Sequence, residues 1–141
     1  MDIQKKSRLL LRVGLGLTFV GIGVYIFMDP LAWGSIMQPW AMKLVGPWLV
    51  PAMYANGAFD VAVGLMLIAG LWTWLAAAFG ALHIFSVLVV AGVSAITVRD
   101  IGLLCASLAL ALDTLPPSIL AKLAPAAVSV PAAKAGMVET K

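Results

Sequence analysis

The sequence predicts an all-α protein, a bundle of four transmembrane helices. The chain has 141 residues, of which 63% are hydrophobic and only 11% are charged, and its mean hydropathy is +1.08. A soluble domain of this size needs far more charge to cover its surface. Four apolar segments also have roughly the 17–25 residues that a membrane-spanning helix requires. Because lipid offers the backbone no hydrogen bonds, each segment is expected to be helical.

The four predicted spans cover residues 9–28, 49–71, 72–91 and 97–115. The first is too long for a signal-peptide core and no small-residue cleavage motif follows it, so we expect it to be retained. Pro116 and Pro117 end the fourth span, because proline cannot continue a helix. Residues 1–117 are therefore expected to form the transmembrane domain, and the Ala/Pro-rich tail 118–141 to lie in the cytoplasm.

The connection between the first two spans, residues 29–48, is rich in tryptophan and proline. It reads DPLAWGSIMQPWAMKLVGPW. Indole rings favour the headgroup level of a bilayer, where one end of the ring is apolar and the other is wet. We expect one or two short interfacial helices here, and interfacial anchoring by all the tryptophans of the chain, which are Trp33, Trp40, Trp48, Trp72 and Trp74.

The distribution of basic residues predicts the orientation. Lys5, Lys6, Arg8 and Arg12 flank the first span, and further lysines follow the fourth. Connections rich in Lys and Arg stay in the cytoplasm, so both termini are expected there. The net charge of +3 is thus interpreted as a topology signal, and no nucleic-acid partner is expected.

Asp60 is an ionisable residue in the middle of the second predicted span, within the sequence NGAFDVAVG. On a helix, Asp60 shares one face with Met53, Asn56, Gly57 and Gly64. An ionised carboxylate at this depth costs at least ~2.5–3.5 kcal/mol if it faces lipid. We therefore expect Asp60 to face the bundle interior, where it has a polar partner or is protonated.

His83, in the third predicted span, is the expected partner of Asp60. The two spans run antiparallel, and both residues fall near mid-depth, about one helical turn apart. The candidate intramembrane polar site comprises Asn56, Asp60, His83 and Ser86. Two interpretations remain open, a hydrogen bond that locks the bundle and a functional site. A single histidine and the single Cys105 predict no metal site.

Arg99 and Asp100 begin the fourth predicted span, near the outer hydrocarbon boundary. Asp100 complements the positive end of the helix dipole there. Arg99 has two possible orientations, outward to lipid phosphates or inward to Asp29 or the Asp60 site. We group Arg99, Asp100 and Asp29 as an expected ion pair at the outer boundary, and interpret Asp113 as an interfacial carboxylate.

Three motifs resemble those of one protein family. GVYIFMDP (residues 23–30), DVAVGLMLIAG (60–70) and RDIGLLCASLALAL (99–112) are similar, in order and spacing, to motifs of the DoxX-like family of small four-span bacterial membrane proteins. The resemblance covers roughly residues 8–115. In one departure, Ile26 stands where the family tends to carry Lys. The resemblance implies a role seen in some relatives, which are small subunits of membrane oxidoreductases such as thiosulfate:quinone oxidoreductase.

The first functional hypothesis is therefore a small integral subunit of a quinone-linked complex of the bacterial inner membrane, an anchor or cavity-forming accessory with other membrane subunits as partners. No covalent cofactor is expected, and a quinone or a lipid is the candidate ligand. The chain lacks a haem histidine pair, a redox cysteine pair and a nucleotide fingerprint, so it is not expected to run redox chemistry alone. The alternatives are a purely structural or assembly subunit, and a homo-oligomeric channel or transporter for protons or a small solute.

Overall fold

The computed structural model describes residues 2–123, and these form helices without any β-strand. Their bounds are α1 Ile3–Met28, α2 Pro30–Gly34, α3 Pro39–Val45, the 3-10 helix η1 Gly46–Trp48, α4 Leu49–Ala69, α5 Thr73–Ala91, α6 Asp100–Asp113 and α7 Pro117–Leu123. The all-α prediction is confirmed. The predicted cytoplasmic tail lies outside the described residues from residue 124 onward.

Within residues 2–123, three helical segments are long and apolar enough to cross a membrane. They are Ile3–Met28, Pro39–Ala69 and Thr73–Ala91, and an 18-residue window within each has a mean hydropathy of 2.0, 1.5 and 2.1, respectively. The first three predicted spans coincide with α1, α4 and α5 to within a few residues, except that α1 begins earlier. The chain is therefore a multi-pass membrane protein. The connection 29–48 contains the short helices α2, α3 and η1, as expected.

The fourth predicted span is shorter than expected. α6 has 14 residues where the sequence suggested a span from 97 to 115. At ~1.5 Å per residue its length is about 21 Å, less than the ~30 Å hydrocarbon core of a typical bilayer. The described residues therefore do not confirm four full-length spans.

Hydrogen bonds of Thr97 explain why α6 starts late. Its hydroxyl donates to the carbonyl of Gly92 and accepts from the amide of Ser94, and Thr97 is only 2% exposed. Such local side-chain bonds to the backbone favour turns over a helix. At the other end, the Thr114 hydroxyl donates to the carbonyl of Leu110, and the Pro116–Pro117 pair follows.

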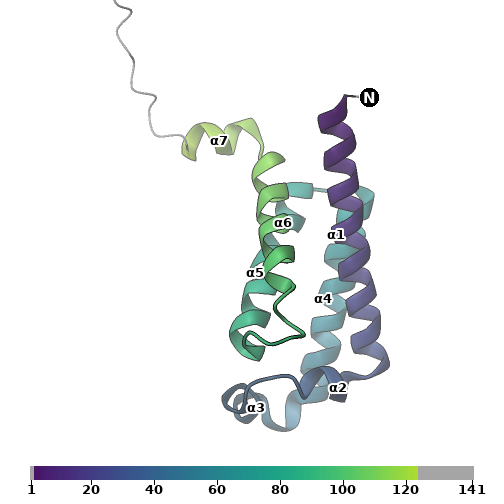
Figure 1. The fold of residues 1–141 in the computed structure, drawn as a ribbon, viewed down its shortest axis with the longest axis vertical. Helices are drawn as coiled ribbons and strands as arrows, with labels where there is room; N and C mark the ends of the chain where they lie inside the picture. The colour runs from purple at the N-terminus through teal and green to yellow at the C-terminus, as the bar shows by residue number, and fades with distance from the viewer. Residues whose placement is uncertain (1, 124–141) are drawn as a thin grey trace, which may run out of the picture.

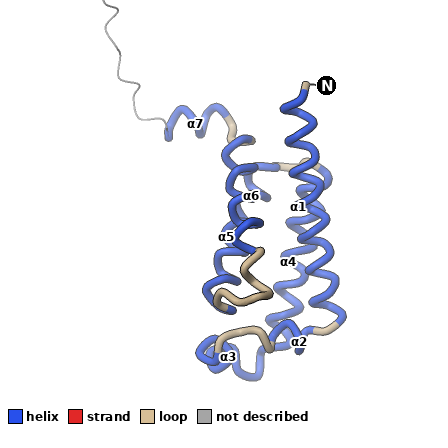
Figure 2. Tube along the Cα trace, viewed as in Figure 1, coloured by secondary structure: helices blue, strands red, loops and turns tan. Residues whose placement is uncertain are grey.

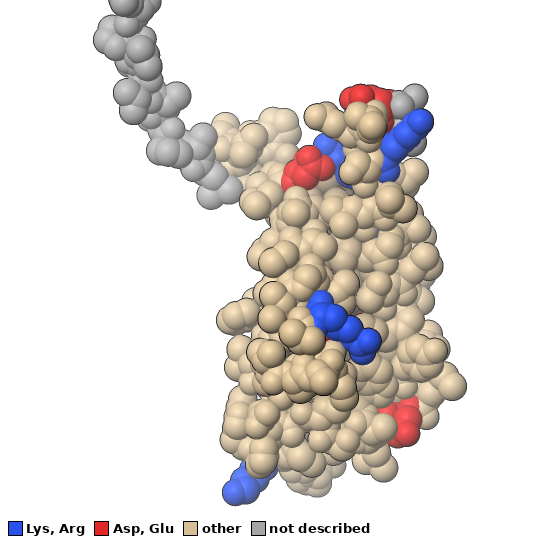
Figure 3. Space-filling view, in the orientation of Figure 1, with Lys and Arg blue, Asp and Glu red and all other residues tan. Residues whose placement is uncertain are grey.

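The four longer helices pack as two pairs, α1 against α4 and α5 against α6, with fewer contacts between the pairs (Figure 1). The N-terminus, the α4–α5 turn and the end of α6 lie at one end of the bundle. The short helices α2 and α3 lie at the other end, and the loop between α5 and α6 turns back above α3 (Figure 2). On the face drawn in Figure 3, most charged side chains gather at the two ends, separated by a broad zone without charge except for one basic patch.

Glycines let α1 and α4 approach closely at two places. A Cβ added at Gly64 would lie 2.6 Å from the carbonyl oxygen of Gly16, and one added at Gly23 would lie 2.6 Å from that of Gly57. Each helix thus presents two glycines seven residues apart to the other. In lipid, where burial of apolar surface gives no driving force between helices, such backbone contact is a main source of helix association.

Replacing Gly64 by alanine should separate α1 from α4, because the new methyl group meets backbone rather than a flexible side chain. We expect Gly64→Ala to lower the free energy of unfolding by about 1–3 kcal/mol, the usual cost of overpacking. Gly14→Ala is the matched control, since nothing lies within 4 Å of its added Cβ. Denaturant unfolding in detergent micelles measures both. Equal stability of the two variants would contradict the packing described.

Candidate functional site

Asp60 is buried midway along α4, beside the glycine face that packs on α1. Its residue exposure is 2%. At 100° per residue, Asp60 is rotated about 60° around α4 from Gly57. The close contact between α1 and α4 therefore occupies one side of α4 and leaves the carboxylate directed to the adjoining side, which faces α5. Lipid does not reach it, as the cost of exposing a carboxylate to acyl chains led us to expect.

The partner of Asp60 is His83, near the middle of α5. The imidazole Nε2 lies 3.0 Å from Asp60 Oδ1, and the side chains are 14% and 3% exposed, respectively. The distance is that of an ion pair, but the ring nitrogen is not aligned for a hydrogen bond, and Oδ1 has no other partner in the described part of the chain. The Phe59 ring lies 5.0 Å from the imidazole, centre to centre, with the two ring planes tilted by 44°. The expected contact between the two residues is thus present.

The Asp60–His83 pair borders a cavity of about 290 Å³ between the helix pairs. Its wall is mostly apolar and comes from α1 to α5, from the segment leading into α6 and from the first turn of α6. The polar residues that the sequence singled out and that line the cavity are Asn56, Asp60, His83, Ser86, Arg99 and Asp100. An apolar cavity with a few convergent polar groups is the usual form of a small-molecule site. The structure therefore joins the intramembrane residues and the Arg99–Asp100 dipeptide in one place.

Ser86 and Asn56 take lesser positions in this cavity. The Ser86 hydroxyl donates to the carbonyl of His83, 2.7 Å away, so it is engaged with its own helix. Asn56 is half-buried one turn before Asp60. Neither contacts the Asp60 carboxylate through a hydrogen bond among the described residues. The assignment of these residues to a functional site stays a prediction.

The expected ion pair at the outer boundary is not formed. Within residues 2–123, neither Asp29 nor Asp100 lies within ion-pair distance of Arg99. Asp29 instead caps α2, because its Oδ1 accepts a hydrogen bond from the amide of Ala32 at 3.0 Å. This capping holds Asp29 at the α1–α2 corner, where it is exposed, whereas Arg99 and Asp100 border the cavity.

The tryptophans divide into two groups. Trp40, Trp48 and Trp72 are 53%, 71% and 72% exposed, as anchors at a headgroup layer would be. Trp33 and Trp74 are half-buried, and Trp33 lines the cavity. Interfacial anchoring stays a prediction for all five tryptophans. The sequence did not indicate that Trp33 lines the cavity, because this residue lies in the connection between two predicted spans.

Gln38 is a residue that sequence reasoning missed. It precedes α3, and its backbone amide donates to the carbonyl of Val90 while its side-chain Nε2 donates to the carbonyl of Ala91, each at 2.9 Å. These two bonds satisfy carbonyls at the end of α5 that have no partner within the helix. They also hold the α2–α3 connection across the end of the cavity. A lone polar side chain beside Pro39, in an otherwise apolar stretch, was the available signal.

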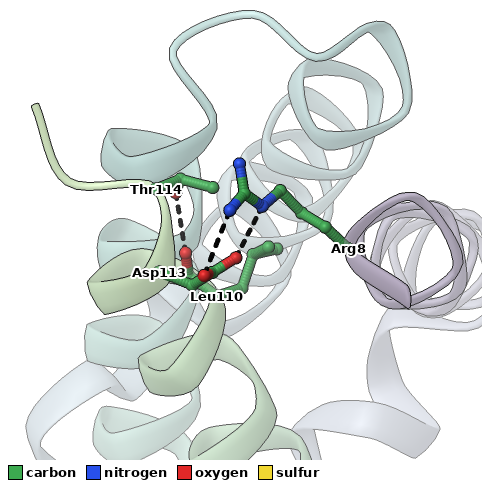
Figure 4. A network of polar contacts seen from close by, with 4 residues as sticks. All are labelled: Arg8, Leu110, Asp113 and Thr114. Carbon is green, nitrogen blue, oxygen red and sulfur yellow. Dashed lines mark hydrogen bonds and ion pairs between the residues drawn. The ribbon is translucent and has the colours of Figure 1, made fainter. Parts of the chain in front are cut away.

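Arg8 and Asp113 form a second unanticipated contact, far from the cavity. Arg8 Nε donates to Asp113 Oδ2 at 2.6 Å and Nη2 donates to Oδ1 at 3.1 Å, which joins α1 to the end of α6 (Figure 4). The side chains are 44% and 52% exposed, so the contribution of this pair to stability is modest. Its geometry still fixes the relative position of the two helices at this end.

One protein-family model matches the part of the chain that contains most of the site. The model of the DoxX family matches residues 7–95, which is more than half of the chain and includes α1 to α5. No curated protein and no solved structure matches the chain. The match includes Asp60, His83 and Gln38 and ends before Arg99 and α6. The chain belongs to the DoxX family of membrane proteins.

Proposed function

We propose that this protein is a small integral subunit of a quinone-linked oxidoreductase in the bacterial inner membrane, and that its cavity admits the quinone head group. The observation that carries the proposal is the buried Asp60–His83 pair at 3.0 Å, bordering a cavity of about 290 Å³. Ligand pockets in proteins usually have about 300–1,000 Å³. The volume suits a ring-sized head group, whose hydrophobic tail would extend into lipid.

Proton transfer is the chemistry that the pair offers. A quinone takes up two electrons and two protons when it is reduced, and the hydroquinone releases them when it is oxidised. Asp60 and His83 can each hold a proton, and His83 Nε2 lies 3.0 Å from Asp60 Oδ1. A carboxylate and an imidazole at the polar end of an apolar cavity can therefore exchange protons with a quinone oxygen.

The electrons are proposed to come from another subunit. The chain has one histidine and one cysteine, so it offers neither a histidine pair for haem nor a dithiol. Cys105 lies in α6, is exposed, and does not line the cavity. The role assigned to this chain is therefore to anchor the complex, shape the quinone site and handle protons.

The orientation is part of the same proposal. α6 is taken as a fourth, short span, and both termini are placed in the cytoplasm. The observations that support this are the common end of the bundle shared by the N-terminus and the end of α6 (Figure 1), and the basic residues at positions 5, 6, 8 and 12. Lys43, on α3, then faces the periplasm.

Cysteine labelling tests the orientation. In a Cys105→Ser background, single cysteines are placed at Ser7, Lys43 or Ser118, all of which are exposed. We expect a membrane-impermeant maleimide to label Lys43→Cys in intact cells, and to label Ser7→Cys and Ser118→Cys only after the membrane is opened. Labelling of Ser118→Cys but not Ser7→Cys in intact cells would show that α6 does not cross.

Purification from native membranes in a mild detergent tests the function. We expect an oxidoreductase to co-purify with this chain and to reduce a short-chain quinone. Asp60→Asn should leave the complex assembled and lower quinone reduction by roughly 10²-fold or more, the usual contribution of a positioned acid or base. Asp2→Asn is the matched control, because Asp2 is exposed and its side chain makes no capping bond.

Each alternative predicts a different result. An assembled complex with unchanged quinone reduction in Asp60→Asn removes the proposed role. A complex that turns over without this chain but dissociates in detergent indicates an assembly subunit. Proton or solute flux through liposomes that contain only this protein indicates a channel.

A further inference from the structure

We propose that Lys5, Arg8 and Arg12 form a binding site for the phosphate of an anionic phospholipid. The site lies at the end of the bundle that carries the N-terminus, on the part of α1 remote from the cavity of the proposed quinone site. It is independent of that function, because it shares no residue with the cavity.

Spacing places the three cations together. Lys5, Arg8 and Arg12 are three and four residues apart in α1, so they lie on one face of the helix over two turns. Together with Leu9 they line a pocket of about 200 Å³. Three cationic side chains around one concave surface repel one another unless an anion lies among them.

The protein supplies only one of the counter-charges that this cluster needs. Asp113 pairs with Arg8 through two hydrogen bonds (Figure 4). Neither Lys5 nor Arg12 has an acidic group within ion-pair distance among residues 2–123. The cluster therefore keeps a net charge of about +2, which attracts an anion.

Packing holds the Arg12 guanidinium in place at this pocket. Its Nε is buried and has no hydrogen-bond acceptor in the described structure. The guanidinium lies against Gly70, whose left-handed φ of 75° and lack of a Cβ leave room for it at the α4–α5 turn. The charge of a guanidinium that packing holds at the pocket wall has no acidic partner within residues 2–123, and a bound anion supplies the missing counter-charge.

Depth favours a lipid as the source of that oxygen. Arg12 follows Leu9, Leu10 and Leu11, and Leu10 is 77% exposed, so the acyl region begins before Arg12. Placing the Arg12 guanidinium about one turn inside this boundary costs free energy unless the guanidinium reaches a phosphate. Leu9 in the same pocket offers a contact to the glycerol or acyl part of the lipid.

The net positive charge of the pocket favours an anionic lipid, because a zwitterionic lipid brings its own cation.

Lipid retention in native mass spectrometry tests the site. The full-length protein is released from mixed micelles that contain phosphatidylglycerol and phosphatidylcholine. We expect the wild type to retain phosphatidylglycerol preferentially. Each charge removed should weaken this retention about fivefold, so Lys5→Gln loses about fivefold and Lys5→Gln with Arg12→Gln loses more than tenfold.

Controls separate binding from folding and from general attraction. Lys43→Gln removes a charge at the opposite end of the bundle and should retain phosphatidylglycerol as the wild type does. Lys5 is exposed, so Lys5→Gln stays informative even if Arg12→Gln fails to fold. Unchanged retention in Lys5→Gln, or an equal loss in Lys43→Gln, overturns the proposal. Displacement of the lipid by millimolar inorganic phosphate would also overturn it, by showing a site for free phosphate.

Discussion

A carboxylate in the middle of a membrane-crossing helix is the constraint on which the rest of the structure depends. Asp60 cannot face acyl chains as an anion, so α4 must direct it inward, and another helix must bring a polar group to the same depth. α5 does so with His83, whose Nε2 lies 3.0 Å from the carboxylate. The orientation of α4 then follows, with its glycines against α1 and its acid toward α5.

The cavity follows from how the helices pair. Glycine contacts draw α1 and α4 together, and α5 packs mainly on α6, so the two pairs leave space between them. The short helices α2 and α3 close one end of that space through Gln38, which bonds to the end of α5. The late start of α6 brings Arg99 and Asp100 to the cavity wall. A polar pair, an apolar chamber and a cation at its wall thus arise from one packing pattern.

The sequence predicted the helices better than it predicted their polar contacts. Hydropathy located α1, α4 and α5, because length and apolar composition alone decide whether a segment can span lipid. The burial of Asp60 and its contact with His83 followed from the cost of exposing a charge in lipid and from antiparallel helix geometry. The same reasoning overestimated the length of α6, where Thr97 binds the preceding turn, and did not indicate that Asp29 caps α2 instead of meeting Arg99. Local bonds of a single side chain leave no periodic signal. The Arg8–Asp113 and Gln38 contacts join residues far apart in the chain, so only the packed structure reveals them.

The direct test of the central claim is the ¹⁵N spectrum of the imidazole in lipid. His83 is the only histidine of the chain, so histidine-selective labelling gives the signals of one ring. If Nε2 faces the Asp60 carboxylate, Asp60→Asn must change the ¹⁵N chemical shifts of that ring, and Asp2→Asn must leave them unchanged. Identical spectra of the wild type and Asp60→Asn would contradict the account, because they would show that the imidazole does not sense the carboxylate.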